Sequence, residues 1–253
     1  LNCPFYVMEM IDGIILTGKE VNKRNIKADD FGKISKVWLE TFVELHSLDY
    51  KSIGLENLGR PEGYIDRQIE IWSYQYNIAK TTDIKSADKV IKWLFENKPS
   101  SQNTSLIHND YKYDNVVFKD ENWNKINSIL DWEMCTIGDP LMDLGTSIAY
   151  WTMSNDHPLI LNGLKSPTIF EGNPSRSKIV ELYCKKTNIK IDDFVFYYVY
   201  GLFKIAVIVQ QIFFRFKKGL SSDQKFSKLD KYAKVLSDTA WQSIQKMQIE
   251  NLY

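Results

Sequence analysis

Three oxygen-bearing side chains, Asp110, Asn115 and Asp131, are spaced in a way that suits phosphoryl transfer. That reaction needs a carboxylate that accepts the proton of an attacking hydroxyl, oxygen ligands for Mg²⁺, and cations that contact the phosphates. Magnesium binds oxygen ligands and takes only one or two protein carboxylates. Lys112 lies two residues after Asp110, within reach of a transferring phosphate. We therefore interpret Asp110 and Lys112 as catalytic candidates, and Asn115 and Asp131 as candidate magnesium ligands.

Short β-rich runs flank these side chains and must position them. The runs are SLIH (105–108), NVVF (115–118) and INSIL (126–130), and they are separated by turns. The loop between the first two runs carries Asp110, and the last run ends directly before Asp131. Because pairing of the strands brings Asp131 beside this loop, we expect the three oxygen groups to converge.

Helical patterns surround these strands. Apolar residues recur at helical spacing after Asp29-Asp30, and Asp139-Pro140 is a favourable helix start. The predicted helices cover residues 31–46, 64–80, 86–97, 140–151, 175–187, 192–218 and 222–249. A further strand is predicted over 3–11, ending at the turn signal Asp12-Gly13. Without βαβ alternation or an internal repeat, the pattern predicts an α+β fold that is mainly helical.

One apolar run, from Phe194 to Phe214, is long enough to span a membrane, which takes about 20 apolar residues. Lys204 lies at its centre, however, where a charge costs roughly 2.5–3.5 kcal/mol in a bilayer. Gln210 and Gln211 add to that cost. We therefore interpret the run as a central helix that is buried on nearly all sides. Lys204 then needs a carboxylate partner or a cavity.

The overall composition excludes several classes of protein. Lysine and arginine number 32, as do aspartate and glutamate, so the net charge is zero. We therefore expect neither a nucleic-acid partner nor, given the buried helix, a membrane partner. The three cysteines include no close pair, and no signal peptide opens the sequence. These features predict a cytoplasmic protein in a reducing compartment.

The motifs HNDYKYDN, ILDWE and GDPLMDLG together resemble the aminoglycoside phosphotransferase family of the protein-kinase-like superfamily. GRPEGYIDRQIEIW resembles the branch fused to some acyl-CoA dehydrogenases. This resemblance implies that Asp110 is the catalytic base and that Asn115 and Asp131 bind Mg²⁺. It also implies ATP or GTP as the phosphoryl donor and a small molecule with a hydroxyl group as the acceptor.

FYVMEMIDG resembles the hinge between the two lobes of a kinase. The resemblance implies that the backbone of Glu9 and Ile11 holds the adenine, and that Met8 and Met10 line its pocket. We also expect these two methionines to be partly core, because a strand buries one of its faces. Residues 1–13 would be the hinge and the end of the N-terminal lobe, and residues 14–253 a kinase-like C-terminal lobe. The resemblance implies an N-terminal lobe with a glycine-rich phosphate loop. Because no such loop occurs in this sequence, the resemblance implies roughly 80–100 further residues upstream. This chain alone should therefore bind nucleotide weakly and turn over slowly or not at all.

The residues around the catalytic loop have plainer interpretations. Asp139 is interpreted as a helix cap, and His108 as a support for the loop. Asp143, one turn after Asp139, can hydrogen-bond the loop from below. His46 is interpreted as a packing or surface residue, and Cys135 as unreactive, because nothing nearby in the sequence would lower its pKa.

The acceptor is less constrained by the sequence. The helices expected to form its cleft contain no dense acidic cluster and are rich in aromatic residues, which favours a partly apolar acceptor over a polycation. The resemblance to the acyl-CoA dehydrogenase branch suggests a hydroxylated acid or its thioester. Two alternatives stay open: a catalytically idle kinase-like binding module, and a choline- or sugar-type kinase that uses the same machinery.

Overall fold

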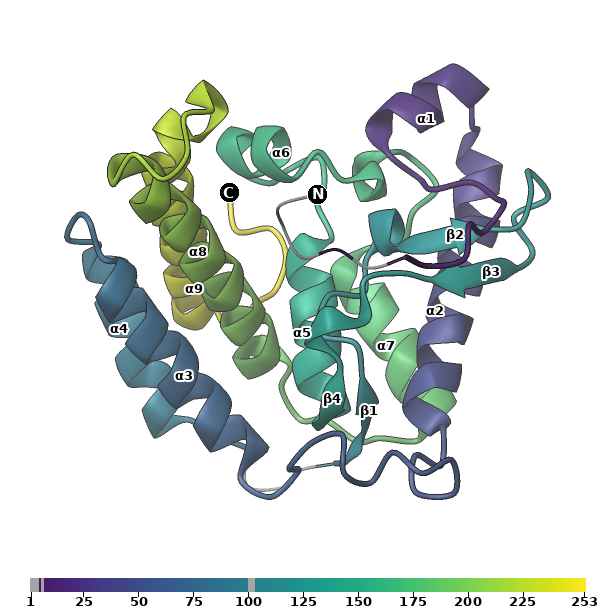
Figure 1. Ribbon diagram of the computed structural model, residues 1–253, viewed down its shortest axis with the longest axis horizontal. Helices are drawn as coiled ribbons and strands as arrows, with labels where there is room; N and C mark the ends of the chain where they lie inside the picture. Colours follow the sequence, from purple (N-terminus) through teal and green to yellow (C-terminus); the bar gives the residue numbers. More distant parts are fainter. Residues whose placement is uncertain (1–4, 6, 100–102) are drawn as a thin grey trace.

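The computed structural model describes residue 5, residues 7–99 and residues 103–253. Within these ranges the chain is mainly helical, with short strands near its middle (Figure 1). The helices are α1 (Gly18–Arg24), α2 (Ala28–Ser47), α3 (Tyr64–Ala79), α4 (Lys85–Glu96), α5 (Pro140–Tyr150), α6 (Pro158–Leu164), α7 (Arg176–Thr187), α8 (Val195–Lys217) and α9 (Leu229–Lys246). The strands are β1 (Ser105–Ile107), β2 (Val116–Phe118), β3 (Ile126–Ile129) and β4 (Thr136–Gly138).

The strands form two small antiparallel sheets. β2 pairs with β3, with Val117 opposite Ser128, and β1 pairs with β4, with Leu106 opposite Ile137. The three predicted strands of this region are therefore present, and β4 was not predicted. The catalytic loop connects β1 to β2 and so joins the two sheets.

The strand predicted over residues 3–11 is wrong in the part that the structure describes. Residue 5 and residues 7–12 have no regular structure, and the nearest pairing is a single bridge between Ile14 and Phe118. A strand needs a neighbour along its length to satisfy its backbone groups, and no described residue pairs with this segment. Residues 1–4 and 6 lie outside the described residues.

Helix α8 forms the centre of the helical half of the molecule. It is long and apolar enough to cross a membrane, yet 83% of its most hydrophobic window is buried inside the protein. This agrees with the prediction of a core helix. α5 and α9 pack along it (Figure 1). The contact with α5 is close because Gly145 and Gly201 face each other: a Cβ on Gly145 would lie 2.2 Å from the carbonyl oxygen of Tyr197.

An aromatic cluster attaches the catalytic loop to α2. The ring of Tyr111 stacks on Phe42 at a centroid distance of 4.2 Å and lies 4.9 Å from the ring of Trp38. The Tyr111 hydroxyl donates a hydrogen bond to the carbonyl oxygen of Trp38 at 2.9 Å. Because Tyr111 directly follows Asp110, this packing fixes the loop against a rigid helix.

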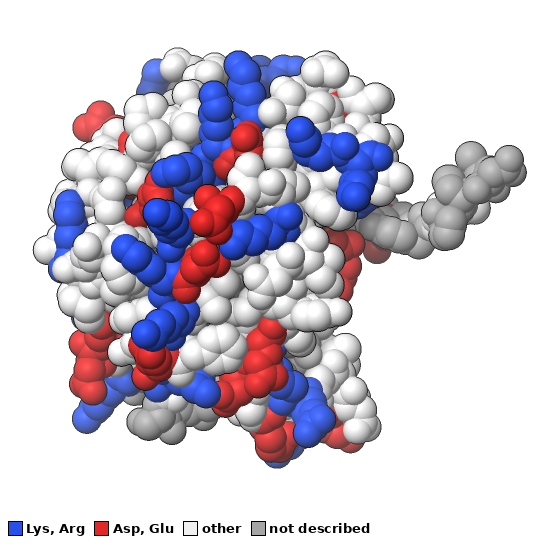
Figure 2. All heavy atoms as spheres, turned by 90° about the vertical axis from the view of Figure 1, so that its left-hand side faces the viewer, with Lys and Arg blue, Asp and Glu red and all other residues white. Residues whose placement is uncertain are grey.

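The surface carries charges of both signs. Figure 2 shows the face at the left-hand side of Figure 1, where cationic and anionic side chains are interspersed. The positive and negative side chains on this face are therefore mixed, and they do not form two separate patches of opposite sign.

Candidate active site

The structure brings Asp110, Lys112 and Asn115 together in the loop between β1 and β2. The Lys112 ammonium lies 2.7 Å from Asp110 Oδ2, and the amide nitrogen of Asn115 donates to the same oxygen at 2.8 Å. Asn115 also donates to the backbone carbonyl of Asp110 at 2.9 Å. Asp110 is thus held in one orientation by two donors, while part of its side chain faces solvent.

Asp143 supports this loop from beneath. Its carboxylate accepts hydrogen bonds from the backbone amides of His108 and Asn109, at 2.7 and 2.8 Å. Its third partner is His46, at 3.2 Å from Nε2. Burial alone would raise the pKa of Asp143, but the hydrogen bond and charge of His46, together with the amide of His108, hold it below its ordinary value. The predicted contact between Asp143 and the loop is therefore present.

Two further expectations about neighbours are confirmed. Asp139 caps α5, because its carboxylate accepts from the amides of Leu141 and Met142. His108 supports the loop: its Nδ1 accepts from the Asp110 amide at 3.2 Å, and its Nε2 lies 2.8 Å from the carbonyl oxygen of Leu130. Burial raises the pKa of Cys135, in keeping with its interpretation as an unreactive thiol.

Asp131 is separated from the end of β3 by Leu130 alone, and its side chain forms no hydrogen bond with Asp110 or Asn115 among the described residues. The amide of Leu130 donates to the Asn115 carbonyl at 2.8 Å, so Asp131 directly follows a residue bonded to the loop. Asp131 has a left-handed backbone conformation with φ of 67°. Such strain in a non-glycine residue is often found at functional sites.

Asn115 and Asp131 carry the kind of oxygen groups that a magnesium ion prefers. Neither Asn115 Oδ1 nor the Asp131 carboxylate hydrogen-bonds to any described residue, so both oxygen groups are available. Within the described ranges, no group of three or more His, Cys, Asp or Glu side chains forms a metal site. Two protein oxygens suit Mg²⁺, which keeps several waters and binds substrate phosphates.

The residues expected to contact the nucleotide lie in the irregular segment that precedes Ile14, which forms the bridge to Phe118 in β2. They are Met8, Glu9, Met10 and Ile11. Met8 is 63% exposed and Met10 is 85% exposed. The expectation that these two methionines are partly core is therefore wrong: no strand lies beside them, and both are mostly exposed among the described residues. The proposed contact with adenine stays a prediction.

A pocket of about 570 Å³ opens beside the catalytic loop. Tyr150 lines it, together with three lysines, Lys19, Lys112 and Lys165. The Lys112 ammonium lies over the Tyr150 ring, 4.8 Å from its centroid. Burial and the negative charge of Asp110 raise the pKa of Tyr150 well above its usual value, so the phenol stays neutral.

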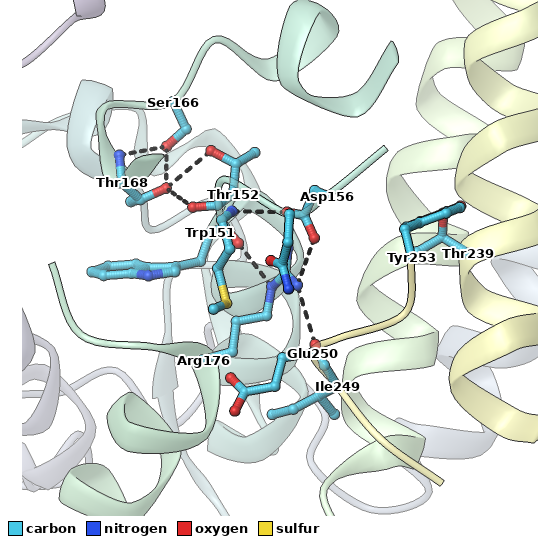
Figure 3. Close-up of polar contacts among 12 residues, drawn as sticks. Trp151, Thr152, Asp156, Ser166, Thr168, Arg176, Thr239, Ile249, Glu250 and Tyr253 are labelled. Atoms are coloured by element: carbon cyan, nitrogen blue, oxygen red, sulfur yellow. Dashed lines mark hydrogen bonds and ion pairs between the residues drawn. The ribbon is translucent and has the colours of Figure 1, made fainter. Parts of the chain in front are cut away.

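Residues 163–167, which also line this pocket, belong to the segment between α5 and α7. A buried arginine, Arg176, holds the start of this segment. Arg176 Nε donates to the carbonyl of Trp151 at 2.8 Å, and its guanidinium pairs with Asp156 and donates to the carbonyl of Ile249 at 3.2 Å. Figure 3 shows the guanidinium between Asp156 and the C-terminal segment. Arg176 therefore joins the start of this segment, at Trp151 and Asp156, to the C-terminal segment at Ile249.

Several residues of the site were not found from the sequence. His46 was interpreted as a packing or surface residue, but it bonds to Asp143 and to the Tyr183 hydroxyl. Tyr150 is one of the aromatic residues in the helices expected to form the acceptor cleft, but its contact with Lys112 was not predicted. Lys165 lies in a loop without a recognisable motif. Only the helical position of Tyr150, seven residues after Asp143, could have placed it on the same face as the loop.

The sequence profile of the phosphotransferase enzyme family, APH, matches residues 1–174. The chain belongs to this family. A Ralstonia eutropha protein provisionally named an aminoglycoside phosphotransferase shares 28% identity and a TM-score of 0.81, over 94% of this chain and 72% of that one. Choline kinase from Cryptosporidium parvum has a TM-score of 0.55 at 14% identity, over 95% of this chain and 71% of that one, which shows likeness of fold. The mainly helical, kinase-like fold predicted from the sequence is thus confirmed.

The curated relatives are longer proteins. Human acyl-CoA dehydrogenase family member 11 is 31% identical over 245 residues, which are 96% of this chain and 31% of the relative. Mouse acyl-CoA dehydrogenase family member 10 is 30% identical over 248 residues, which are 95% of this chain and 22% of the relative. The chain therefore spans about a quarter to a third of these relatives, and the predicted resemblance to this branch is confirmed.

Proposed function

We propose that the intact protein transfers a phosphoryl group from ATP to a hydroxyl group of a small molecule, with Mg²⁺. Residues 14–253 would be its catalytic C-terminal lobe, and residues 1–13 its hinge and the end of its N-terminal lobe. The observation that carries the proposal is the Asp110 carboxylate, which is fixed by Lys112 and Asn115 next to a pocket. Membership of the phosphotransferase family supports it.

Each loop residue has a distinct part in this proposal. Asp110 orients the acceptor hydroxyl and takes its proton, and Lys112 contacts the phosphoryl group as it moves. Asn115 Oδ1 and Asp131 would hold Mg²⁺, which neutralises charge on the phosphates when bound. The backbone of Glu9 and Ile11 would hold the adenine.

The pocket supports an anionic acceptor. Lys19, Lys112 and Lys165 line it, against a single carboxylate from Asp114. Neither Lys19 nor Lys165 forms an ion pair with the described residues. Such a pocket repels an aminoglycoside polycation, and choline recognition would need carboxylates around an aromatic cage. We therefore propose a hydroxylated acid, or its thioester, as the acceptor.

The catalytic role of Asp110 is tested by the rate of ADP formation in the intact protein. Asp110→Asn should lower kcat by about 10²–10⁴, the usual value of a general base. Asp120→Asn, in the β2–β3 turn, is the matched control and should leave kcat unchanged. A kcat for Asp110→Asn within threefold of the wild type would refute the proposal.

The charge of the acceptor is tested with a panel of hydroxy acids, their thioesters, choline and aminoglycosides. Lys165→Glu should raise KM for the anionic acceptor about fivefold, in line with roughly 1 kcal/mol for an exposed ion pair. Lys51→Glu, on a distant loop, is the control. Turnover with aminoglycosides alone would remove the anionic acceptor from consideration.

A melting scan separates this enzyme from an idle binding module. ATP should raise the Tm of the intact protein only when Mg²⁺ is present, and ADP should then form. A rise in Tm with no ADP formed from any acceptor would identify a binding module instead.

A further inference from the structure

Lys204 is a buried charge at the centre of α8. Its side chain is 1% exposed, and it forms no ion pair with a carboxylate among the described residues. Of the two alternatives expected from the sequence, a carboxylate partner or a cavity, the carboxylate partner is absent among the described residues. Burial lowers the pKa of Lys204 to about 8. A buried cation without a carboxylate partner is unfavourable for folding. Core packing alone therefore does not account for a lysine at this position.

The partners of Lys204 lie in the catalytic loop. Its ammonium donates to the backbone carbonyl of Asn109 at 2.8 Å and lies 3.4 Å from Asn109 Oδ1. It also lies over the ring of Trp72, 5.7 Å from the centroid. Lys204 is thus bonded to the residue that directly precedes the candidate base Asp110.

Asn109 is held from several sides. Its backbone is left-handed, with φ of 68°, which costs free energy in a non-glycine residue. Its side-chain amide donates to the Met134 carbonyl at 3.0 Å, and its Oδ1 accepts from the Tyr64 hydroxyl at 3.2 Å. Its backbone amide donates to Asp143. Lys204 supplies the partner for the remaining group, the carbonyl.

That carbonyl belongs to the peptide unit that joins Asn109 to Asp110. The amide of the same unit donates to His108 Nδ1 at 3.2 Å. Lys204 and His108 therefore hold the two ends of one peptide plane. Because the Cα of Asp110 lies at the edge of this plane, the plane sets the direction in which its carboxylate leaves the backbone.

We propose that Lys204 is a positioning residue for phosphoryl transfer: it fixes the Asn109–Asp110 peptide plane and thereby aims the Asp110 carboxylate at the acceptor. This inference rests on the proposed function. The ionisable groups that face the ammonium are the carboxylates of Asp143 and Asp110, the Lys112 ammonium and the Tyr64 phenol. The two carboxylates favour the charged form of Lys204, and Lys112 and burial oppose it.

The test compares Lys204→Met with the matched control Lys217→Met, at the exposed end of the same helix, in the intact protein. Lys204→Met keeps the chain length, removes the buried charge and leaves the Asn109 carbonyl without its partner. The first change stabilises the fold and the second destabilises it, so the Tm should stay close to that of the wild type. Its kcat should fall at least tenfold, with KM for ATP unchanged within twofold. Lys217→Met should leave kcat, KM and Tm unchanged.

The pH profile gives a second readout that a purely structural role would not change. The wild-type kcat should fall above about pH 8, as Lys204 loses its proton. This fall should be absent from the residual activity of Lys204→Met. Hydrogen exchange of the Asp110 amide should be faster in the variant.

Three results would overturn the inference. They are a kcat for Lys204→Met within twofold of the wild type, a change in KM alone, or a lower Tm with an unchanged pH profile. Absence of turnover in the wild type would instead remove the proposed function itself, which separates the two failures.

Discussion

Replacing Arg176 with methionine should destabilise the chain by about 3–5 kcal/mol. Arg176 is 1% exposed, and its guanidinium makes hydrogen bonds to two backbone carbonyls and pairs with Asp156 through both carboxylate oxygens. It also lies over the ring of Tyr198, 5.2 Å from the centroid. Methionine keeps most of the packing volume and removes every one of these polar contacts.

The size of this destabilisation follows from the Asp156 carboxylate, which stays buried after Arg176 is removed. Asp156 is 8% exposed, and without Arg176 its carboxylate keeps one hydrogen bond, from the Met153 amide at 2.8 Å. Breaking a buried ion pair by removing one partner costs about 3–5 kcal/mol, because the other charge stays buried. This is a large fraction of the 5–15 kcal/mol that stabilises a typical domain.

The assay is denaturant unfolding of this chain, followed by tryptophan fluorescence. The control is Lys178→Met, which removes an exposed ion pair with Glu181 on the same helix and should cost about 0–1 kcal/mol. In the Arg176→Met background, Asp156→Asn should recover at least about 1 kcal/mol, because it removes the stranded charge. A loss below about 1 kcal/mol for Arg176→Met, or no recovery in the double variant, would refute this reasoning.

Two other predictions concern stability. Burial raises the pKa of Asp139 to about 6, so the folded state binds a proton more tightly than the unfolded state; its contribution is full below about pH 4 and is lost as the pH rises through 6. From pH 4 to 7, the free energy of unfolding of the wild type should therefore fall by up to about 3 kcal/mol relative to that of Asp139→Asn. This magnitude is 1.36 kcal/mol for each of about two pKa units. A difference between the two proteins that stays constant with pH in denaturant unfolding would contradict this. Gly145→Ala should lower the free energy of unfolding by at least about 2 kcal/mol, because the new Cβ would collide with the backbone of α8. Gly32 in α2 has open space around it, so Gly32→Ala should be neutral or stabilising by about 0.5–1 kcal/mol. Equal Tm values for the two alanine variants would show that α5 and α8 can separate at no cost.

The parts of the fold that were predicted correctly are those with a long local pattern. α2, α3, α4, α5, α7 and α8 begin and end within a few residues of the predicted bounds. The helix predicted over 222–249 is present as α9, preceded by a 3₁₀ segment over Gln224–Lys228. The missed elements α1, α6 and β4 are short, and α1 and α6 each bury one residue. Their stability comes from the surroundings, which a local pattern does not contain.

The candidate site likewise has a part that the sequence predicted, from local spacing, and a part that it did not predict. Asp110, Lys112 and Asn115 lie within six residues of one another, and their spacing predicted that they would meet. The contacts that hold this loop join residues far apart in the sequence: His46 reaches Asp143 across 97 residues, and Lys204 reaches Asn109 across 95. A sequence can show that Lys204 needs a partner, but the partner becomes visible only when α8 is packed behind the loop.

The central claim is that Asp110 activates an acceptor hydroxyl for phosphoryl transfer, and ³¹P NMR of the intact protein with Mg²⁺, ATP and a hydroxy acid tests it most directly. We predict a new phosphomonoester resonance that grows in step with ADP and is absent with Asp110→Asn. ADP accompanied only by inorganic phosphate, or the same phosphomonoester formed at the same rate by Asp110→Asn, would contradict the claim.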